Sequence, residues 1–285
     1  MYLFMSPLIE INDLLLADKS NLIILDARGF AGAYDRYLAG HLDGALFVEL
    51  DRDLANVPEN AANGGRHPLP SPEAFAGLLT RLGITPETHI VVYDDKAGAN
   101  SAARLWWMLK AIGHQQVQVL NGGLQAAINH GVALSTDVVV PQPAAQPYPV
   151  PLEFSGTVDI DEVGKAAHDD ARLVIDVREN PRYLGQTEPI DSVAGHIPGA
   201  INVPFASNLD ASGKYRSAEE LQAAYKNSLG NVKPEDTIVH CGSGVTACHT
   251  LLALEHAGLP GAKLYVGSWS EWSRRDLPVG KEERY

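Results

Sequence analysis

The strongest constraint on the fold is that the chain carries the same series of local patterns twice. Residues 23–28 (IILDAR) return as residues 173–178 (LVIDVR), and residues 39–45 (AGHLDGA) return as residues 194–200 (AGHIPGA). The two offsets, 150 and 155 positions, are nearly equal. A period of this length is too long for a solenoid and predicts two copies of one domain.

Each half alternates short apolar runs, typical of buried strands, with segments of helical periodicity. Strands are expected at 22–25, 46–48, 89–93, 117–120 and 237–239, and helices at 71–82, 101–112, 217–225 and 248–256; residues 173–178 repeat the strand-containing segment 23–28. Ser71 followed by Pro72 is a typical start of a helix. This order predicts an α/β protein in which each half is a mostly parallel sheet with helices on both faces.

The composition changes between the two halves. Residues 141–151 contain five prolines, which predicts an extended, semi-rigid linker. We therefore expect an N-terminal domain at 1–140, a linker at 141–156 and a C-terminal domain at 157–285.

Composition and charge exclude several classes of protein. A hydrophobic content of 45% and a charged content of 20% are typical of a soluble globular protein. The formal net charge of −13 argues against a nucleic-acid partner and against binding to anionic membranes. No apolar run approaches the roughly 18 residues of a membrane span. The only cysteines, Cys241 and Cys248, form no disulfide framework, so we expect a reducing compartment and a cytoplasmic protein.

Residues 240–247 (HCGSGVTA) are the segment that most strongly indicates chemistry. A β-branched run precedes Cys241 and a leucine-rich helical pattern follows, so the cysteine is expected between a strand and a helix N-terminus. Gly242 and Gly244 allow successive N–H groups to form an anion-binding nest, to which the helix dipole adds positive potential. This setting favours a nucleophilic Cys241 thiolate. Cys248 falls within the helix and is expected in the core.

Several motifs together resemble the tandem-domain rhodanese-type sulfurtransferases: two Asp-x-Arg pairs, GHIPGA, the CGSGVTA loop and the closing YVGSWSEW. The likeness extends over roughly residues 7–280. It is closest to the 3-mercaptopyruvate sulfurtransferases, since thiosulfate-specific relatives usually carry two basic residues where this chain has Gly242 and Ser243. The resemblance implies two rhodanese-like domains, a small-molecule sulfur donor, a persulfide on Cys241 and release of pyruvate. A thiol, a thioredoxin-like protein or cyanide would accept the sulfur, and no cofactor is implied.

The resemblance also implies roles for residues far from the cysteine. Asp51 and His67 match an aspartate and a histidine that, with the loop residue Ser243, form a proton relay. Arg182 matches an arginine that binds the donor's carboxylate or sulfonate, a role that suits its planar guanidinium. The remaining substrate-binding positions are in the loop itself: Gly242, Gly244, Val245 and Thr246.

The family's second donor-binding arginine is missing from this chain. Residues 188–191 (EPID) stand where it is expected. Its absence leaves tight binding of mercaptopyruvate in question, and Arg36 and Arg66 are the candidates to replace it.

The first half has no cysteine at the corresponding loop. It carries Asp94-Asp95-Lys96 there. A carboxylate cannot carry a persulfide, so the N-terminal domain is expected to be catalytically silent.

Three other functions are alternatives to the prediction of a 3-mercaptopyruvate sulfurtransferase. Cysteine-dependent phosphatases need an arginine at the end of such a loop, where this chain has Ala247, so a phosphatase is disfavoured. A thiosulfate sulfurtransferase and a non-catalytic sulfur-carrier or binding module both remain open.

Residues that recur in both halves are expected to be structural, because only one half has the nucleophile. Histidines at corresponding positions of separate domains, with no cysteine or carboxylate at ligand spacing, do not indicate a metal site. The four tryptophans are expected to pack in the core or between domains. The recurrent residues are Asp26 with Arg28, Asp176 with Arg178, and His41 with His196; the tryptophans are Trp106, Trp107, Trp269 and Trp272.

Overall fold

The computed structural model describes residues 5–98 and 100–281, and the chain forms two compact units. The first unit comprises the residues up to Asn56, Leu69–Ser155 and Ala211–Lys214. The second comprises Val57–Pro68, Gly156–Asp210 and the residues from Tyr215 onward. The division near residue 156 lies at the end of the expected linker. Two short segments, however, belong to the unit that does not contain their neighbours in the sequence.

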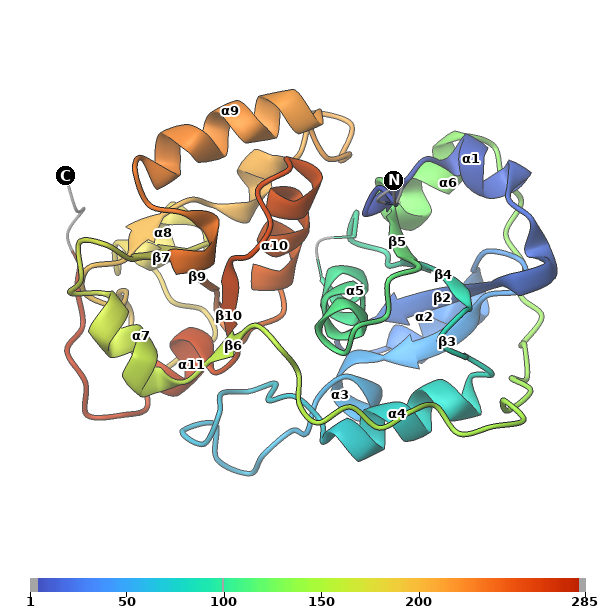
Figure 1. The fold of residues 1–285 in the computed structure, drawn as a ribbon, viewed down its shortest axis with the longest axis horizontal. Helices are drawn as coiled ribbons and strands as arrows, with labels where there is room; N and C mark the ends of the chain where they lie inside the picture. Colours follow the sequence, from blue (N-terminus) through green and yellow to red (C-terminus); the bar gives the residue numbers. More distant parts are fainter. Residues whose placement is uncertain (1–4, 99, 282–285) are drawn as a thin grey trace. The chain divides into compact units, whose positions relative to one another are not determined.

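The first unit is built on a five-stranded sheet with the strand order β1-β5-β4-β2-β3 (Figure 1). All four strand pairs are parallel. The strands are β1 (Leu8–Ile9), β2 (Leu22–Arg28), β3 (Leu46–Glu49), β4 (His89–Tyr93) and β5 (Val117–Leu120). The helices are α1 (Ile11–Leu16), α2 (Ala33–Ala39), α3 (Leu50–Asp53), α4 (Pro72–Arg81), α5 (Ser101–Ala111) and α6 (Gly123–Asn129), with a 3₁₀ turn at Lys19–Asn21.

The second unit repeats this topology, with the strand order β6-β10-β9-β7-β8 and all pairs parallel. The strands are β6 (Thr157–Val158), β7 (Leu173–Asp176), β8 (Ile201–Asn202), β9 (Thr237–His240) and β10 (Lys263–Tyr265). The helices are α7 (Ile160–Ala166), α8 (Asn180–Tyr183), α9 (Ala218–Leu229), α10 (Ala247–His256) and α11 (Ser268–Trp272), with 3₁₀ turns at Phe205–Asn208 and Pro234–Asp236. The predicted α/β fold with two parallel sheets is confirmed.

Equivalent serines begin equivalent helices in the two units. Ser71 precedes α4 and its Oγ accepts a hydrogen bond from the Ala74 N–H at 3.2 Å. Ser217 precedes α9 and forms a capping box, in which its Oγ and the side chain of Glu220 each accept a hydrogen bond from the other residue's N–H. Such caps satisfy N–H groups that have no partner inside the helix. The start at Ser71 was predicted for this reason, and the start at Ser217 from its place in the repeat.

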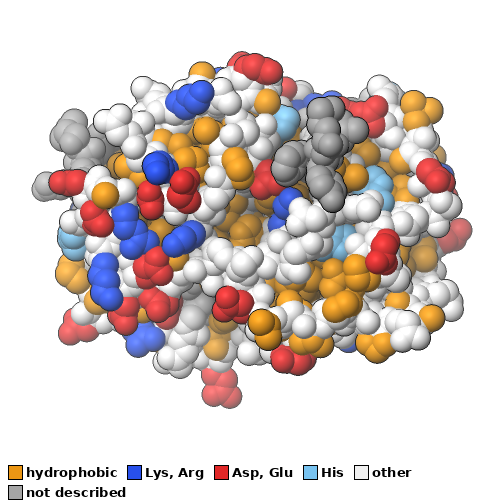
Figure 2. All heavy atoms as spheres, in the orientation of Figure 1, with side chains coloured by type: hydrophobic (Ala, Val, Ile, Leu, Met, Phe, Trp, Pro, Cys, Tyr) orange, Lys and Arg blue, Asp and Glu red, His pale blue; other side chains and the backbone are white. Residues whose placement is uncertain are grey.

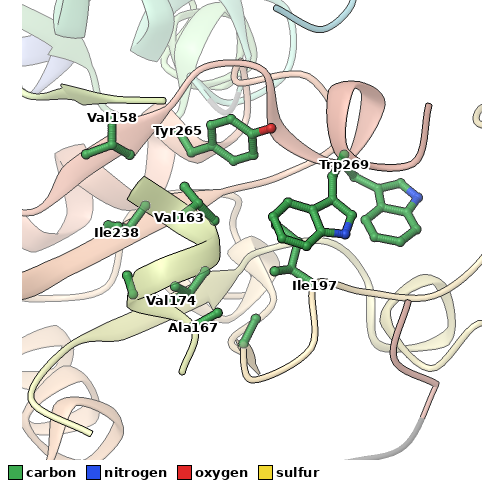
Figure 3. Close-up of a cluster of buried hydrophobic side chains, with 11 residues drawn as sticks. Val158, Val163, Ala167, Val174, Ile197, Ile238, Tyr265 and Trp269 are labelled. Atoms are coloured by element: carbon green, nitrogen blue, oxygen red, sulfur yellow. The ribbon is translucent and has the colours of Figure 1, made fainter. Parts of the chain in front are cut away.

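One apolar cluster fixes α11, which borders the cysteine loop, to the second sheet (Figure 3). Val163 of α7 and Trp269 of α11 pack with Val174, Ile238 and other side chains from the same face of the strands. Trp269 is fully buried, and burial of a large aromatic side chain contributes a few kcal/mol of stability. The prediction that Trp269 and Trp272 lie in the core is confirmed for this unit.

The repeated aspartate–arginine pairs are buried ion pairs at the ends of central strands. Arg28 donates to Asp26 through Nε and Nη2, both at 2.7 Å, and Arg178 donates through Nη2 to Asp176 at 2.6 Å. Arg178 Nη2 also donates to the backbone carbonyl of Gly195, at 2.6 Å. Their structural role is confirmed, since each pair joins a strand end to a neighbouring loop.

The repeated histidines are also structural. Each ring stacks on a tyrosine, with centroid distances of 3.9 Å for His41 on Tyr37 and 3.8 Å for His196 on Tyr183. Each Nδ1 is 2.8 Å from the backbone carbonyl oxygen of the same tyrosine. The histidine–tyrosine pairs therefore have the same structural role in the two units.

The proline-rich segment lies along the first unit. The Ala144 N–H donates to the Thr80 carbonyl, and the Tyr148 N–H donates to the Thr80 hydroxyl, both at 2.9 Å. Near the end of the segment, the Ser155 N–H donates to the Ala111 carbonyl at 3.0 Å. The segment is thus extended but bound to the first unit up to Ser155.

The surface combines both signs of charge. On the face drawn in Figure 2, basic and acidic side chains are interspersed, although acidic residues outnumber basic ones in the whole chain, 35 to 22. An anionic ligand must therefore be attracted by a local arrangement of positive groups. Among the described residues, no helix is both long and apolar enough to cross a membrane.

Candidate active site

Cys241 lies at the carboxyl end of β9, and its loop leads into α10. This is the arrangement that the sequence predicts: the β-branched run Thr237–His240 forms a strand, and the loop ends at the first turn of a helix. The side chain is 3% exposed. Cys248, by contrast, is in α10 and fully buried, with its Sγ 3.4 Å from the Gly244 carbonyl oxygen, so its predicted place in the core is confirmed.

Backbone hydrogen bonds join the cysteine loop to the segment around α11. The Trp269 and Ser270 N–H groups donate to the carbonyls of Cys241 and Gly242, at 3.0 and 2.8 Å. In the opposite direction, the Cys241 N–H donates to Ser268 Oγ at 3.2 Å. The backbone on both sides of Cys241 is therefore fixed, which is the structural role of the YVGSWSEW motif.

Gly244 allows the tight bend of this loop. Its φ is +74°, a conformation that residues with a side chain rarely adopt. A Cβ at this position would lie 2.4 Å from the Val266 carbonyl oxygen. The bend and the close approach to the α11 segment both require glycine here.

His67 contacts the loop although it precedes it by 176 positions. Its Nδ1 is 2.8 Å from Ser243 Oγ, a normal hydrogen-bond distance between a ring nitrogen and a hydroxyl. The segment Val57–Pro68 carries His67 into the second unit. Neighbouring backbone bonds hold the segment there: the Gly64 N–H donates to Glu271 at 3.2 Å and the Arg66 N–H to Ser270 Oγ at 3.0 Å.

Two guanidinium groups lie beside Gly242. A Cβ at this glycine would be 3.2 Å from Arg66 Nη2 and 3.7 Å from Arg182 Nη2. Because position 242 has no side chain, two positive groups can lie close to the residue that follows Cys241. Arg36, the other candidate for the missing arginine, instead donates to Asp95 in the first unit at 2.7 Å.

Two carboxylates orient these arginines. Glu188 accepts from Arg182 through both oxygens, at 2.6 and 3.2 Å, and also from Arg178 at 3.2 Å. Asp191, whose side chain is fully buried, accepts from Arg66 and, at 2.6 Å, from Arg274. These acids occupy the stretch in which the second family arginine is missing.

The remaining predicted site residues have the following places. Val245 and Thr246 belong to the loop itself, between Gly244 and the start of α10. Asp51 lies on α3 of the first unit and its side chain is exposed. Its part in a proton relay stays a prediction.

Sequence reasoning missed the residues that support the site: Glu188, Asp191, Ser268, Ser270 and Arg274. The EPID stretch was noticed only for the arginine it lacks. One signal was available in the sequence. Glu188 and Asp191 lie within four positions of each other, in a segment where an anion-binding arginine is expected, and two acids in such a place require basic partners nearby. Among the described residues, no three His, Cys, Asp or Glu side chains gather in a way that could hold a metal ion.

The comparisons with known proteins agree with this architecture. The Rhodanese-like domain family matches residues 10–130 and 159–275, so the chain belongs to this family and carries the domain twice. A probable 3-mercaptopyruvate sulfurtransferase of Pseudomonas aeruginosa is 39% identical over 277 residues, covering 92% of this chain and 94% of the relative. The thiosulfate sulfurtransferase of Rattus norvegicus is 35% identical over 268 residues, covering 90% and 87%.

Solved structures give the same result. The 3-mercaptopyruvate sulfurtransferase of Leishmania major superposes with a TM-score of 0.80 at 30% identity, over 94% of this chain and 75% of that one. SseA of Escherichia coli, a 3-mercaptopyruvate sulfotransferase, superposes with a TM-score of 0.75 at 31% identity, over 94% of this chain and all of that one. Within its family, this chain is a sulfurtransferase.

Proposed function

We propose that the enzyme takes the sulfur of 3-mercaptopyruvate, holds it as a persulfide on Cys241 and passes it to a thiol acceptor. The observation that carries the proposal is the 2.8 Å contact between His67 Nδ1 and Ser243 Oγ, two positions after the cysteine. A hydroxyl bonded to an imidazole is suited to proton transfer. A mercaptopyruvate donor needs a proton for its enolate leaving group, whereas thiosulfate leaves as sulfite, which needs none.

In the first half-reaction the Cys241 thiolate attacks the donor sulfur. An S–S bond forms, the donor's C–S bond breaks, and its electron pair stays on the three-carbon fragment as an enolate. Ser243 gives its proton to the enolate carbon, producing pyruvate, and His67 returns a proton to the Ser243 oxygen. Cys241 is left as Cys–S–SH. Asp51 is the proposed third member of this relay.

In the second half-reaction an acceptor thiol loses its proton to the relay and attacks the outer sulfur. The products are the acceptor persulfide and the Cys241 thiolate, so the relay regains the proton it gave. A thioredoxin-like protein or cyanide accepts sulfur by the same attack. We propose a reducing, cytoplasmic setting, with neither membrane nor nucleic acid as a partner; the two free, buried cysteines support the reducing environment.

The first unit supports the anion-binding part of this proposal. In its equivalent loop, four backbone N–H groups donate to the Asp94 carboxylate, at 2.7 to 3.2 Å. A loop of this design therefore binds a negative charge after the strand, which is where the second unit has its sulfur nucleophile. We propose that the first unit, centred on residues 1–140, is catalytically silent, that 141–156 is the linker and that 157–285 form the catalytic domain.

The test compares 3-mercaptopyruvate and thiosulfate as donors, with cyanide as acceptor, and follows the mass of the protein after each donor alone. We expect the higher kcat/KM with 3-mercaptopyruvate and the addition of one sulfur atom at Cys241. Cys248→Ala is the matched control and should still gain the sulfur. A higher kcat/KM with thiosulfate would make the enzyme a thiosulfate sulfurtransferase, and the absence of turnover with either donor would favour a sulfur carrier.

A further inference from the structure

We infer that Arg66, which the segment Val57–Pro68 delivers to the second unit, binds the donor's carboxylate together with Arg182 and replaces the arginine missing from residues 188–191. This inference rests on the proposed function. The class of ligand is a small α-keto monocarboxylate.

The two guanidinium groups present their unused nitrogens on the same side. Among the described residues, Arg66 Nη2 and Arg182 Nη1 have no hydrogen-bond partner, although Arg66 Nη1 is bound to Asp191 and Arg182 Nη2 to Glu188. Both unused nitrogens lie close to Gly242: a Cβ there would be 3.2 Å from Arg66 Nη2 and 3.9 Å from Arg182 Nη1. A carboxylate beside Gly242 would therefore receive one hydrogen bond from each arginine.

Asp191 holds Arg66 in this position. The Asp191 side chain is fully buried, and its Oδ1 accepts from both Arg66 and Arg274. Its Oδ2 is buried without a hydrogen-bond partner among the described residues and lies 3.8 Å from Arg182 Nη2. A buried carboxylate surrounded by three guanidinium groups is strongly constrained, so Asp191 is a positioning residue for Arg66 and Arg182.

The backbone of Arg66 is fixed separately. Its N–H donates to Ser270 Oγ, and the Ser270 N–H donates to the Gly242 carbonyl. Ser270 thus links the chain at Arg66 directly to the residue that follows the nucleophile. The distance from the carboxylate subsite to the cysteine is set by these short bonds rather than by the flexible arginine side chain.

The geometry also explains why the acids at 188 and 191 are compatible with an anionic donor. Glu188 binds Arg182 through Nε and Nη2, and Asp191 binds Arg66 through Nη1, so neither acid occupies Arg182 Nη1 or Arg66 Nη2. The two carboxylates orient the guanidinium groups and reduce the electrostatic repulsion between them. Planar forks of this kind fit a carboxylate better than a single ammonium group would.

The experiment measures kcat and KM for 3-mercaptopyruvate, and the inhibition constant of pyruvate, in Arg66→Gln, Arg66→Lys and Arg172→Gln. Arg172 is the matched control: it is 22% exposed against 24% for Arg66, and it pairs with Glu162 away from the loop. Arg66→Gln should raise both constants by about 10- to 100-fold, as expected for one charged hydrogen bond, with a much smaller change in kcat. Arg66→Lys, which keeps the charge but not the fork, should lie in between, and Arg172→Gln should match the wild type.

The outcomes separate the two proposals. If the wild type does not turn over 3-mercaptopyruvate, the proposed function fails whatever the variants do. If the wild type is active and Arg66→Gln shows the KM and pyruvate inhibition of Arg172→Gln, the assignment of Arg66 is wrong. Asp191→Asn should reproduce part of the Arg66→Gln effect, and it should add little to it in the double variant because both act through the same guanidinium group.

Discussion

Asp94 and Cys241 occupy the same place in the two units, after the central strands β4 and β9 and before the helices α5 and α10. In the first unit the side chain at this place accepts four backbone hydrogen bonds from its own loop, from the N–H groups of Lys96, Gly98, Asn100 and Ala102. Burial raises the pKa of the Asp94 carboxyl, and the four donors oppose that rise because they bind the charged form best.

The difference shows how one residue changes the use of a loop. A carboxylate fills the loop and converts its N–H groups into internal support. A cysteine instead places a sulfur atom at the end of a short side chain, which is the atom that we propose attacks the donor. The second unit also has the His67–Ser243 contact and two arginines beside Gly242, whereas in the first unit Arg36 donates to Asp95, the residue that follows Asp94.

The largest expected effect is on activity at the two equivalent positions. Cys241→Ser should reduce turnover by more than about 1,000-fold, because a hydroxyl cannot form a persulfide. Asp94→Asn, at the equivalent place in the first unit, should leave kcat within about twofold of the wild type. Steady-state assays of both variants check this pair, and substantial turnover by Cys241→Ser would disprove the nucleophile.

The buried pairs Asp26–Arg28 and Asp176–Arg178 offer a second comparison. Asp176→Asn should cost about 3–5 kcal/mol of unfolding free energy, because it neutralises the carboxylate that pairs with the buried Arg178 at 2.6 Å and leaves the longer, 3.2 Å contact with Glu188 as the remaining ion pair of Arg178 among the described residues. Asp26→Asn should cost a similar amount. Only Asp176→Asn should also lower activity, since the Arg178 guanidinium lies over the Trp269 ring, at 4.7 Å, and Trp269 binds the cysteine loop.

The cost of Asp176→Asn should depend on pH. Burial alone would raise the pKa of Asp176, but the Arg178 charge and its hydrogen bonds outweigh burial and hold that pKa below its ordinary value of 3.8. The stabilisation is therefore complete above pH 3.8 and is lost as the pH falls through the lower folded-state value. Urea unfolding at neutral and acidic pH checks the sign: the difference between wild type and variant should narrow in acid, and a widening would contradict it.

The third effect concerns the stability of the first unit. Asp94→Ala leaves four N–H groups without their acceptor, those of Gly98 and Ala102 at buried contacts and those of Lys96 and Asn100 at partly buried ones, and should cost about 2–4 kcal/mol. Cys241→Ala should cost less, because among the described residues no comparable set of N–H groups donates to the cysteine side chain. Sulfate should raise the Tm of Asp94→Ala more than that of the wild type by occupying the emptied loop, and equal shifts would argue against an anion-binding loop.

The smallest expected effect tests the proton relay. Ser243→Ala should lower kcat with 3-mercaptopyruvate by about 100-fold, the usual contribution of general acid–base catalysis. Lys96→Ala, two positions after Asp94 as Ser243 is after Cys241, is the control and should not change kcat. With thiosulfate as donor the Ser243→Ala effect should nearly vanish, because sulfite needs no proton; an equal loss with both donors would contradict the relay.

Much of the fold could be predicted because its signals are local. The duplicated Asp-x-Arg and Gly-His segments, the serine caps at 71 and 217, and the apolar strand runs each encode hydrogen bonds or packing within a few residues. The short helices α2 and α6 were not assigned. Both follow a glycine with positive φ, at Gly32 and Gly122, and each has only seven residues, too few for a clear helical period.

Residue patterns alone predict two parallel α/β halves and one loop, between β9 and α10, that carries a cysteine. The packing of residues 57–68 with the second unit is visible only in the folded chain; it places His67 on Ser243 and puts Arg66, and not Arg36, beside Gly242. The physical reason is range. Strands, caps and turns follow from neighbouring residues, whereas a contact across 176 positions depends on the packing of everything between them and leaves no periodic trace in the sequence.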